Sequence, residues 1–126
     1  MNSDQLLNRT LEYSKRVISL INKQKEKNAL LSQLLRSATS IGANYREAIS
    51  AESKRDFIHK ISICKKEANE TLYWIELVAH NDANSAQELR LIWKETKEFL
   101  LIFSKTLSTA KLNLASSTKR SMPNKK

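Results

Sequence analysis

Residues 29–51 read ALLSQLLRSATSIGANYREAISA, and their apolar side chains recur every three or four positions. The recurring positions are Leu31, Leu34, Ala38, Ile41, Tyr45 and Ala48, joined by Leu35 and Ile49. At 100° per residue these positions fall within one arc of a helix, whereas a half-buried strand alternates strictly. The stretch therefore predicts an amphipathic helix over about 29–51, with Asn28 as its capping residue.

Three other segments show the same periodicity, and they predict helices over about 4–23, 54–81 and 85–112. We expect Ser53 to cap the third helix, and Ser85 with Glu88 to form the capping box that opens the fourth. The positions expected to be buried are Leu6, Leu7, Leu11, Val17, Ile18, Leu20 and Ile21 in the first helix, Phe57, Ile61, Cys64, Ala68, Leu72, Ile75 and Ala79 in the third, and Leu89, Ile92, Trp93, Thr96, Phe99, Leu100, Phe103, Leu107 and Ala110 in the fourth.

The chain has 126 residues but a single glycine and a single proline, the residues that turns normally require. Connections are therefore short, and short connections make neighbouring helices antiparallel. We predict an all-α fold, an antiparallel up-down-up-down four-helix bundle over residues 1–114. Residues 115–126 are rich in Ser, Lys and Asn and contain the proline, so we expect a disordered basic tail there.

Several classes of protein are disfavoured by the sequence. The N-terminal residues lack the basic and apolar regions of a signal peptide, and no apolar run approaches the roughly 18 residues that span a bilayer. Cys64 is the single cysteine, so an intramolecular disulfide is impossible, which fits a reducing compartment. We expect a cytoplasmic protein that does not contact a membrane.

No cluster of residues indicates a reaction. His59 and His80 lack the spacing of a metal site, and one glycine is too few for a glycine-rich phosphate loop. Cys64 lies on a face predicted to be buried, where cysteine usually acts as a small hydrophobic residue. We therefore expect a protein that is not an enzyme and that holds no metal and no cofactor.

The helix predicted over 54–81 carries a second apolar stripe, on the side away from its buried face. This stripe consists of Ile63, Tyr73, Trp74 and Leu77, and it makes residues 73–79 apolar nearly all the way round. A bundle of four helices has no central helix that would bury such a surface. Two interpretations remain, a subunit interface or a patch that the fourth helix or the tail covers.

The helix predicted over 29–51 has a thin polar face opposite its apolar one. This face is formed by Gln33, Arg36, Ser40, Asn44 and Glu47. It is either solvated, with pairs between residues four apart, or packed on another subunit through directed hydrogen bonds. Gly42 costs about 1 kcal/mol relative to alanine within a helix. We attribute it to the close approach of another backbone, because glycine has no side chain to hold a neighbour away.

The net charge is +9, from 22 basic and 13 acidic side chains, and no acidic residue follows Phe99. This excess suits either a soluble surface with a basic tail or attraction to a polyanion such as RNA. The candidate nucleic-acid contacts are Arg9, Lys15 and Arg16 in the first helix, Lys23, Lys25 and Lys27 at its end and in the loop after it, and Lys119, Arg120, Lys125 and Lys126 in the tail.

Residues 36–48 read RSATSIGANYREA, and SKRDF at 53–57 and EANET at 67–71 follow. These stretches resemble the R-x-A-x-S-I-x-x-N-x-x-E-A, S-K-x-[DE]-F and E-x-x-E-[ST] patterns of the bacterial four-helix-bundle proteins encoded within intervening sequences of 23S ribosomal RNA genes. The resemblance covers roughly residues 5–112. It implies a homo-oligomer, specifically a pentameric ring, as in the related accessory protein of diversity-generating retroelements, which binds nucleic acid and a reverse transcriptase. By the resemblance, Arg36, Ser40, Asn44, Glu47 and Glu70 are pattern positions without a catalytic role.

The candidate subunit-interface residues are accordingly Arg36, Ser40, Gly42, Asn44, Glu47, Ile63, Glu70, Tyr73, Trp74 and Leu77. The leading hypothesis for function is a non-enzymatic oligomer that associates with RNA through its basic surface. One alternative is a scaffold that recruits a nucleic-acid enzyme such as a reverse transcriptase, and another is a selfish-element protein with little cellular function. The expected partners are further copies of the chain, RNA or DNA, and a protein partner.

Overall fold

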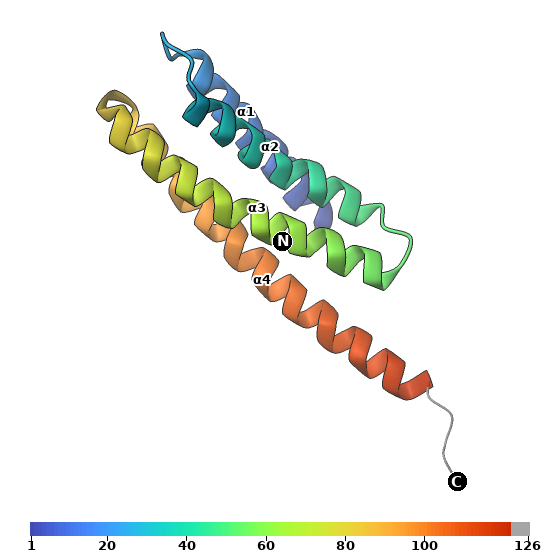
Figure 1. The fold of residues 1–126 in the computed structure, drawn as a ribbon. Coiled ribbons are helices and arrows are strands. Elements are labelled where there is room, and N and C mark those ends of the chain that lie inside the picture. The colour runs from blue at the N-terminus through green and yellow to red at the C-terminus, as the bar shows by residue number, and fades with distance from the viewer. Residues whose placement is uncertain (122–126) are drawn as a thin grey trace.

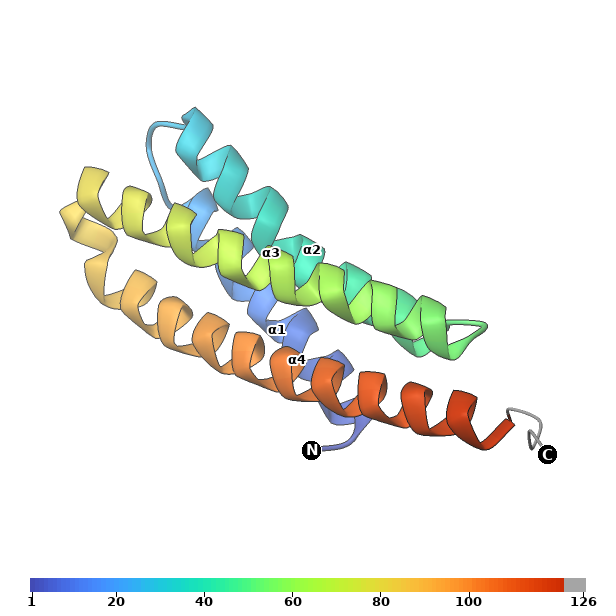
Figure 2. The same ribbon diagram turned by 60° about the horizontal axis from the view of Figure 1, so that its bottom comes forward.

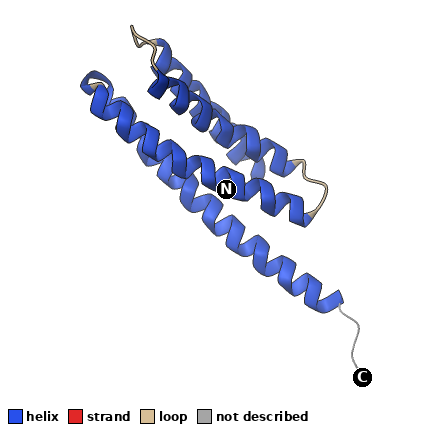
Figure 3. Cartoon of the chain, in the orientation of Figure 1, coloured by secondary structure: helices blue, strands red, loops and turns tan. Residues whose placement is uncertain are grey.

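A computed structural model describes residues 1–121, with side chains through Ser117. This part of the chain is all-α and contains no strand (Figure 3). Its elements are α1 (Ser3–Asn22), α2 (Ala29–Ile49), α3 (Lys54–Asn81), a short 3₁₀ turn η1 (Ala83–Ser85) and α4 (Ala86–Ser121). Up to the end of α4, these bounds differ from the predicted ones by at most two residues.

The helices pack side by side, and the chain turns back at each connection (Figures 1 and 2). α3 packs against α2 and against α4, and α1 packs against α2 and touches α4. α4 is the longest helix, and its C-terminal end extends beyond the turn between α2 and α3 (Figure 1). Much of its outer surface therefore remains free of neighbouring helices.

Side chains at the helix starts determine where the chain enters each helix. The Asn28 side chain accepts a hydrogen bond from the backbone N–H of Leu31 at 3.0 Å, and Ser53 accepts one from Asp56 at 3.0 Å, both as predicted. The capping box expected of Ser85 and Glu88 is replaced by other contacts. The Ser85 hydroxyl donates to Asp82 at 3.0 Å, and the Glu88 carboxylate pairs with Lys23 instead.

α4 continues to Ser121, beyond the end predicted near residue 112. Residues 115–121 of the expected disordered tail are therefore helical, and residues 122–126 lie outside the described part. Serine, threonine and lysine are tolerated at exposed helical positions, and no glycine or proline interrupts residues 86–122. Pro123 is the first residue after position 86 in the sequence whose type disfavours a helix.

The core lies between the helices and contains all six apolar positions that define the predicted buried face of α2. α1 differs from the prediction, because Leu11 is 43% exposed and Ile18 is 42% exposed. Tyr13 and Thr10 are buried instead, on the arc that also holds Leu6, Val17, Leu20 and Ile21. A tyrosine can occupy this arc because its hydroxyl lies 2.6 Å from the hydroxyl of Thr96 on α4.

A hydroxyl pair also joins α2 to α3. Thr71 Oγ1 and Ser37 Oγ lie 2.9 Å apart, at hydrogen-bonding distance, and both residues are fully buried. Among the side chains that the structure describes, every buried nitrogen and oxygen has a hydrogen-bond partner. Burial of these polar groups is therefore compensated, and the bonds specify how one helix sits on the next.

Candidate nucleic-acid and subunit interfaces

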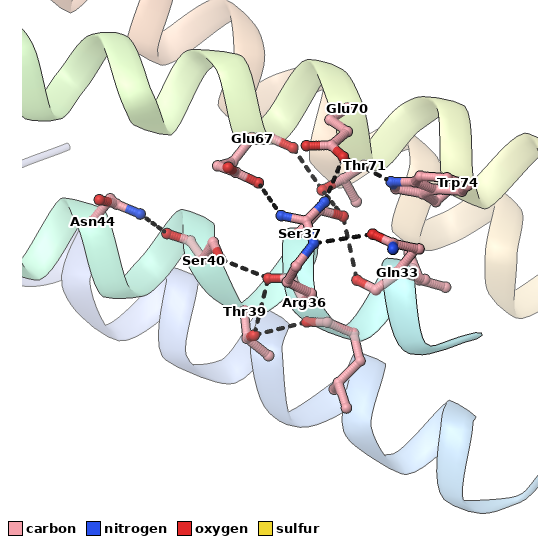
Figure 4. Close-up of polar contacts among 12 residues, drawn as sticks. Gln33, Arg36, Ser37, Thr39, Ser40, Asn44, Glu67, Glu70, Thr71 and Trp74 are labelled. Atoms are coloured by element: carbon pink, nitrogen blue, oxygen red, sulfur yellow. Dashed lines mark hydrogen bonds and ion pairs between the residues drawn. The ribbon is translucent and has the colours of Figure 1, made fainter. Parts of the chain in front are cut away.

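The polar face of α2 lies beside α3 and forms a cluster of contacts within the chain (Figure 4). Arg36 is at its centre. The Arg36 guanidinium donates to Gln33 Oε1 at 3.0 Å and to Glu67 Oε2 at 3.4 Å, and it also pairs with Glu70. Glu70 in turn accepts a hydrogen bond from Trp74 Nε1 at 3.1 Å. Arg36 therefore has anionic partners on its own subunit.

The other polar residues of this face are also engaged within the chain. Ser40 Oγ donates to the Arg36 carbonyl at 2.6 Å, and Asn44 Nδ2 donates to the Ser40 carbonyl at 2.8 Å. Glu47 accepts a hydrogen bond from Lys60 on α3 at 3.1 Å. These contacts match the interpretation in which the face is solvated and pairs internally, and they leave its exposed residues open to a neighbour.

The close approach predicted at Gly42 is present, but the neighbouring backbone is α1 of the same chain. A Cβ atom at position 42 would lie 3.2 Å from Thr10 Cβ and 3.5 Å from the Thr10 carbonyl carbon. Gly42 is therefore explained by packing inside the subunit.

The second apolar stripe of α3 remains partly uncovered. Helical spacing places Ile63, Trp74 and Leu77 on the same side of α3 as Glu70, which faces Arg36 of α2. All three are half-buried. Tyr73, in contrast, is 56% exposed, and its ring meets the Trp74 ring edge-on with the ring centroids 5.1 Å apart. Neither α4 nor its described C-terminal end covers Tyr73, so this aromatic edge stays available to another molecule.

The basic residues predicted on α1 are mostly neutralised by α4 and by α1 itself. Arg9 pairs with Glu95, at 3.0 Å, and with Glu98, and Arg16 also pairs with Glu95. Two lysines pair likewise, Lys15 with Glu12 at 3.1 Å and Lys23 with Glu88 at 3.0 Å. Four cations thus face four carboxylates, which leaves this surface without an excess of positive charge.

The remaining predicted nucleic-acid contacts lie in the loop after α1 and near the C-terminus of the chain. Lys27 Nζ donates to the carbonyls of Ile21 and Gln24 at 2.6 and 2.7 Å, so it caps the end of α1. Lys25 is exposed in the loop. Lys119 and Arg120 belong to α4, but the side chains of Lys119, Arg120, Lys125 and Lys126 lie outside the described part.

The structure reveals a basic surface that sequence reasoning missed, on the outer face of α4. It consists of Arg90, Lys94, Lys97, Lys105 and Lys111, which we call the α4 basic row. At 100° per residue these five positions fall within an arc of about 120°, opposite the buried positions of α4. All five side chains are exposed, and none forms a salt bridge with a residue that the structure describes.

No acidic side chain lies within the arc of the α4 basic row, because Glu95 and Glu98 point toward α1. The row therefore carries an excess of positive charge, unlike the α1 surface. The signal was present in the sequence, since the polar side of the predicted fourth helix carries only basic and neutral residues in this arc.

The described residues offer little for catalysis. Among them, no group of three His, Cys, Asp or Glu side chains is placed to hold a metal ion. Cys64 is fully buried, and its thiol contacts the Ile41 carbonyl at 3.6 Å. Burial raises the pKa of the Cys64 thiol to about 12, which keeps it protonated and unreactive near neutral pH. Within residues 1–121, no helix has the length and apolar content that crossing a bilayer requires.

A four-helix chain with a basic row that is unpaired among the described residues and with an exposed aromatic edge belongs, by its fold, to the class of small all-α proteins. The comparison with known families makes this more specific. The chain belongs to the family described as 23S rRNA-intervening sequence protein, whose model matches residues 3–105. The family resemblance seen in residues 36–48, 53–57 and 67–71 is thereby confirmed.

A solved structure supports the same assignment. It is the crystal structure, at 1.70 Å resolution, of a protein with unknown function from the S23 ribosomal protein family of Bacteroides thetaiotaomicron VPI-5482. The two chains are 37% identical, and the match covers 86% of this chain and 99% of that one, with a TM-score of 0.77. No curated protein matches the chain.

Proposed function

We propose that this protein is a non-enzymatic subunit of a homo-oligomer that associates with RNA through the α4 basic row. The observation that carries the proposal is the row itself, five exposed cations on one helix face without a salt-bridge partner among the described residues. Lysine and arginine in such a row bind phosphates and release the counterions that surround a nucleic acid. The family description, which refers to a 23S rRNA intervening sequence, favours RNA as the polyanion.

The proposed assembly is a pentameric ring of up-down-up-down bundles, as the family resemblance implies. The aromatic edge at Tyr73 and the polar face of α2 supply surfaces for contacts between subunits. In a ring each α4 basic row is repeated by symmetry, so the moderate charges of the individual subunits sum to a strong positive field. Light scattering tests the assembly, and a mass near that of one 14.5 kDa chain would overturn it.

RNA association is tested by fluorescence anisotropy with a labelled structured RNA at low and high salt. We expect binding at micromolar protein that weakens steeply as salt rises. The variant Lys94→Gln/Lys97→Gln removes two charges from the row and should weaken binding. The matched control, Lys15→Gln/Lys23→Gln, removes two charges that already have carboxylate partners and should bind almost normally.

Two results would overturn the RNA proposal. One is the absence of binding at micromolar protein and low salt. The other is a control variant that loses as much affinity as the row variant, because net charge alone would then explain the binding.

A second candidate function is a scaffold that recruits a nucleic-acid enzyme such as a reverse transcriptase. The exposed Tyr73 ring, packed edge-on against Trp74, is the observation that favours it. Exposed aromatic side chains are enriched at protein interfaces. In this case Tyr73→Ala should abolish capture of the enzyme. Lys94→Gln/Lys97→Gln should weaken RNA binding and leave capture of the enzyme intact.

A further inference from the structure

The α4 basic row is divided into two groups of cations by a gap. Arg90, Lys94 and Lys97 form the first group, which spans about 10 Å along the helix, and Lys105 and Lys111 form the second, which spans about 9 Å. The gap from Lys97 to Lys105 is eight residues, or about 12 Å at 1.5 Å per residue. Leu101 stands in this gap and is 63% exposed.

The size of the gap matches a groove between two phosphate backbones. The major groove of B-form DNA is about 12 Å wide, and phosphates line both of its edges. A helix placed across a groove of this width sets one group of cations on each edge. An apolar side chain between the groups then lies over the groove, where it meets no phosphate.

The row lacks the features that proteins use to hold a single strand. Single strands are bound on exposed aromatic side chains, on which successive bases stack. Trp93 is the aromatic residue nearest the row, but it is half-buried, packs against the core, and has the Lys97 ammonium 5.8 Å from its ring centre. No exposed aromatic side chain lies in the arc of the row among the residues that the structure describes.

We infer that the α4 basic row recognises double-stranded nucleic acid, by placing its two groups of cations on the two phosphate backbones that border one groove. This inference rests on the proposed function and specifies the form of its ligand. Phosphate contacts are independent of sequence, and both DNA and RNA duplexes present paired backbones. The shared chemistry is therefore the duplex backbone, and the experiment separates the two sources.

The test is a salt series of anisotropy measurements with labelled oligonucleotides of one sequence. The probes are duplex DNA, duplex RNA and each single strand, all about 12 nucleotides long, which is about 40 Å of duplex and enough for one row. Binding to five phosphates of B-form DNA predicts a slope of log affinity against log salt of about −4.5, since each contact contributes about −0.9. Lys94→Gln/Lys97→Gln and Lys105→Gln/Lys111→Gln should each bring the slope to about −2.7, because each removes two contacts.

Leu101→Lys distinguishes a groove from a strand that follows the row. Over a groove the new cation faces the bases and adds no phosphate contact, so the slope measured with a duplex should not change. Along a single strand it adds one contact and steepens the slope by about 0.7. Leu101→Gln controls for loss of the apolar side chain.

The outcomes separate the inference from the proposed function. Tighter binding of either duplex than of both single strands, with contributions from both groups of cations, supports the inference, and the tighter duplex identifies the source. If single strands bind as tightly as the duplexes, the inference is overturned and RNA association stays intact. The same holds if Leu101→Lys steepens the slope of log affinity against log salt that is measured with a duplex. Failure to bind any of the probes overturns the proposed function and the inference together.

Discussion

Replacing Thr96 with valine should cost more stability than replacing its partner Tyr13 with phenylalanine. The Thr96 hydroxyl has one proton, which it donates to the Ile92 carbonyl at 2.6 Å. The Tyr13 hydroxyl, 2.6 Å from Thr96 Oγ1, is therefore the donor in the bond between the two side chains. Thr96 is the partner of this hydroxyl in the structure, and both residues are fully buried.

The two substitutions differ in what they leave behind. Tyr13→Phe removes one hydrogen bond, and Thr96 keeps the Ile92 carbonyl, so the expected cost is about 1 kcal/mol. Thr96→Val removes the same bond and the bond from Thr96 to the Ile92 carbonyl, and it leaves a buried phenol without an acceptor. These losses raise the expected cost to about 2–3 kcal/mol. The double variant removes the stranded hydroxyl as well, so it should be more stable than Thr96→Val by about 1 kcal/mol.

Urea unfolding followed by circular dichroism measures these differences. All variants are compared at one protein concentration, because association of subunits stabilises the folded state by mass action. The midpoints report differences in stability only if the free energy of unfolding falls with urea concentration at a comparable slope in all variants. Equal costs for Tyr13→Phe and Thr96→Val, or a double variant that is the least stable of the three, would contradict a buried phenol stranded without its acceptor.

Three further predictions concern other parts of the fold. Burial raises the pKa of the Cys64 thiol from 9.0 to about 12. The contribution of the thiol to stability is therefore complete below pH 9 and is lost as pH rises toward 12. When the urea midpoint is plotted against pH, Cys64→Ala should reduce its fall between pH 9 and 12. Gly42→Ile should destabilise by about 1–3 kcal/mol because its side chain would collide with Thr10, whereas Gly42→Ala should stay within about 1 kcal/mol of the parent, and thermal unfolding compares them. Arg36→Ala leaves Glu67 and Glu70 unpaired and should cost about 1 kcal/mol at low salt and less at high salt, again from urea midpoints; equal costs at both salts would contradict an ionic origin.

The helices of this protein are legible in its sequence because helix formation depends on residues that are close along the chain. Apolar residues three and four positions apart predict α2 and its buried face, and Asn28 and Ser53 mark where two helices begin. The same local information misplaces the end of α4. A run of serine, threonine and lysine fits either a tail or an exposed helix, so its composition alone does not choose between them.

The surfaces depend on which helices meet, and local periodicity carries no such information. α1 has two adjacent apolar arcs, and packing against α2 and α4 buries the arc of Tyr13 while Leu11 stays exposed. Which charges are neutralised also depends on which helices meet. Arg9 is separated from Glu95 and Glu98 by more than eighty residues in the sequence, yet it forms ion pairs with both. The α4 basic row keeps its positive charge because no carboxylate from another helix reaches it within the described chain. Contacts between distant residues thus decide which cations remain available to a ligand.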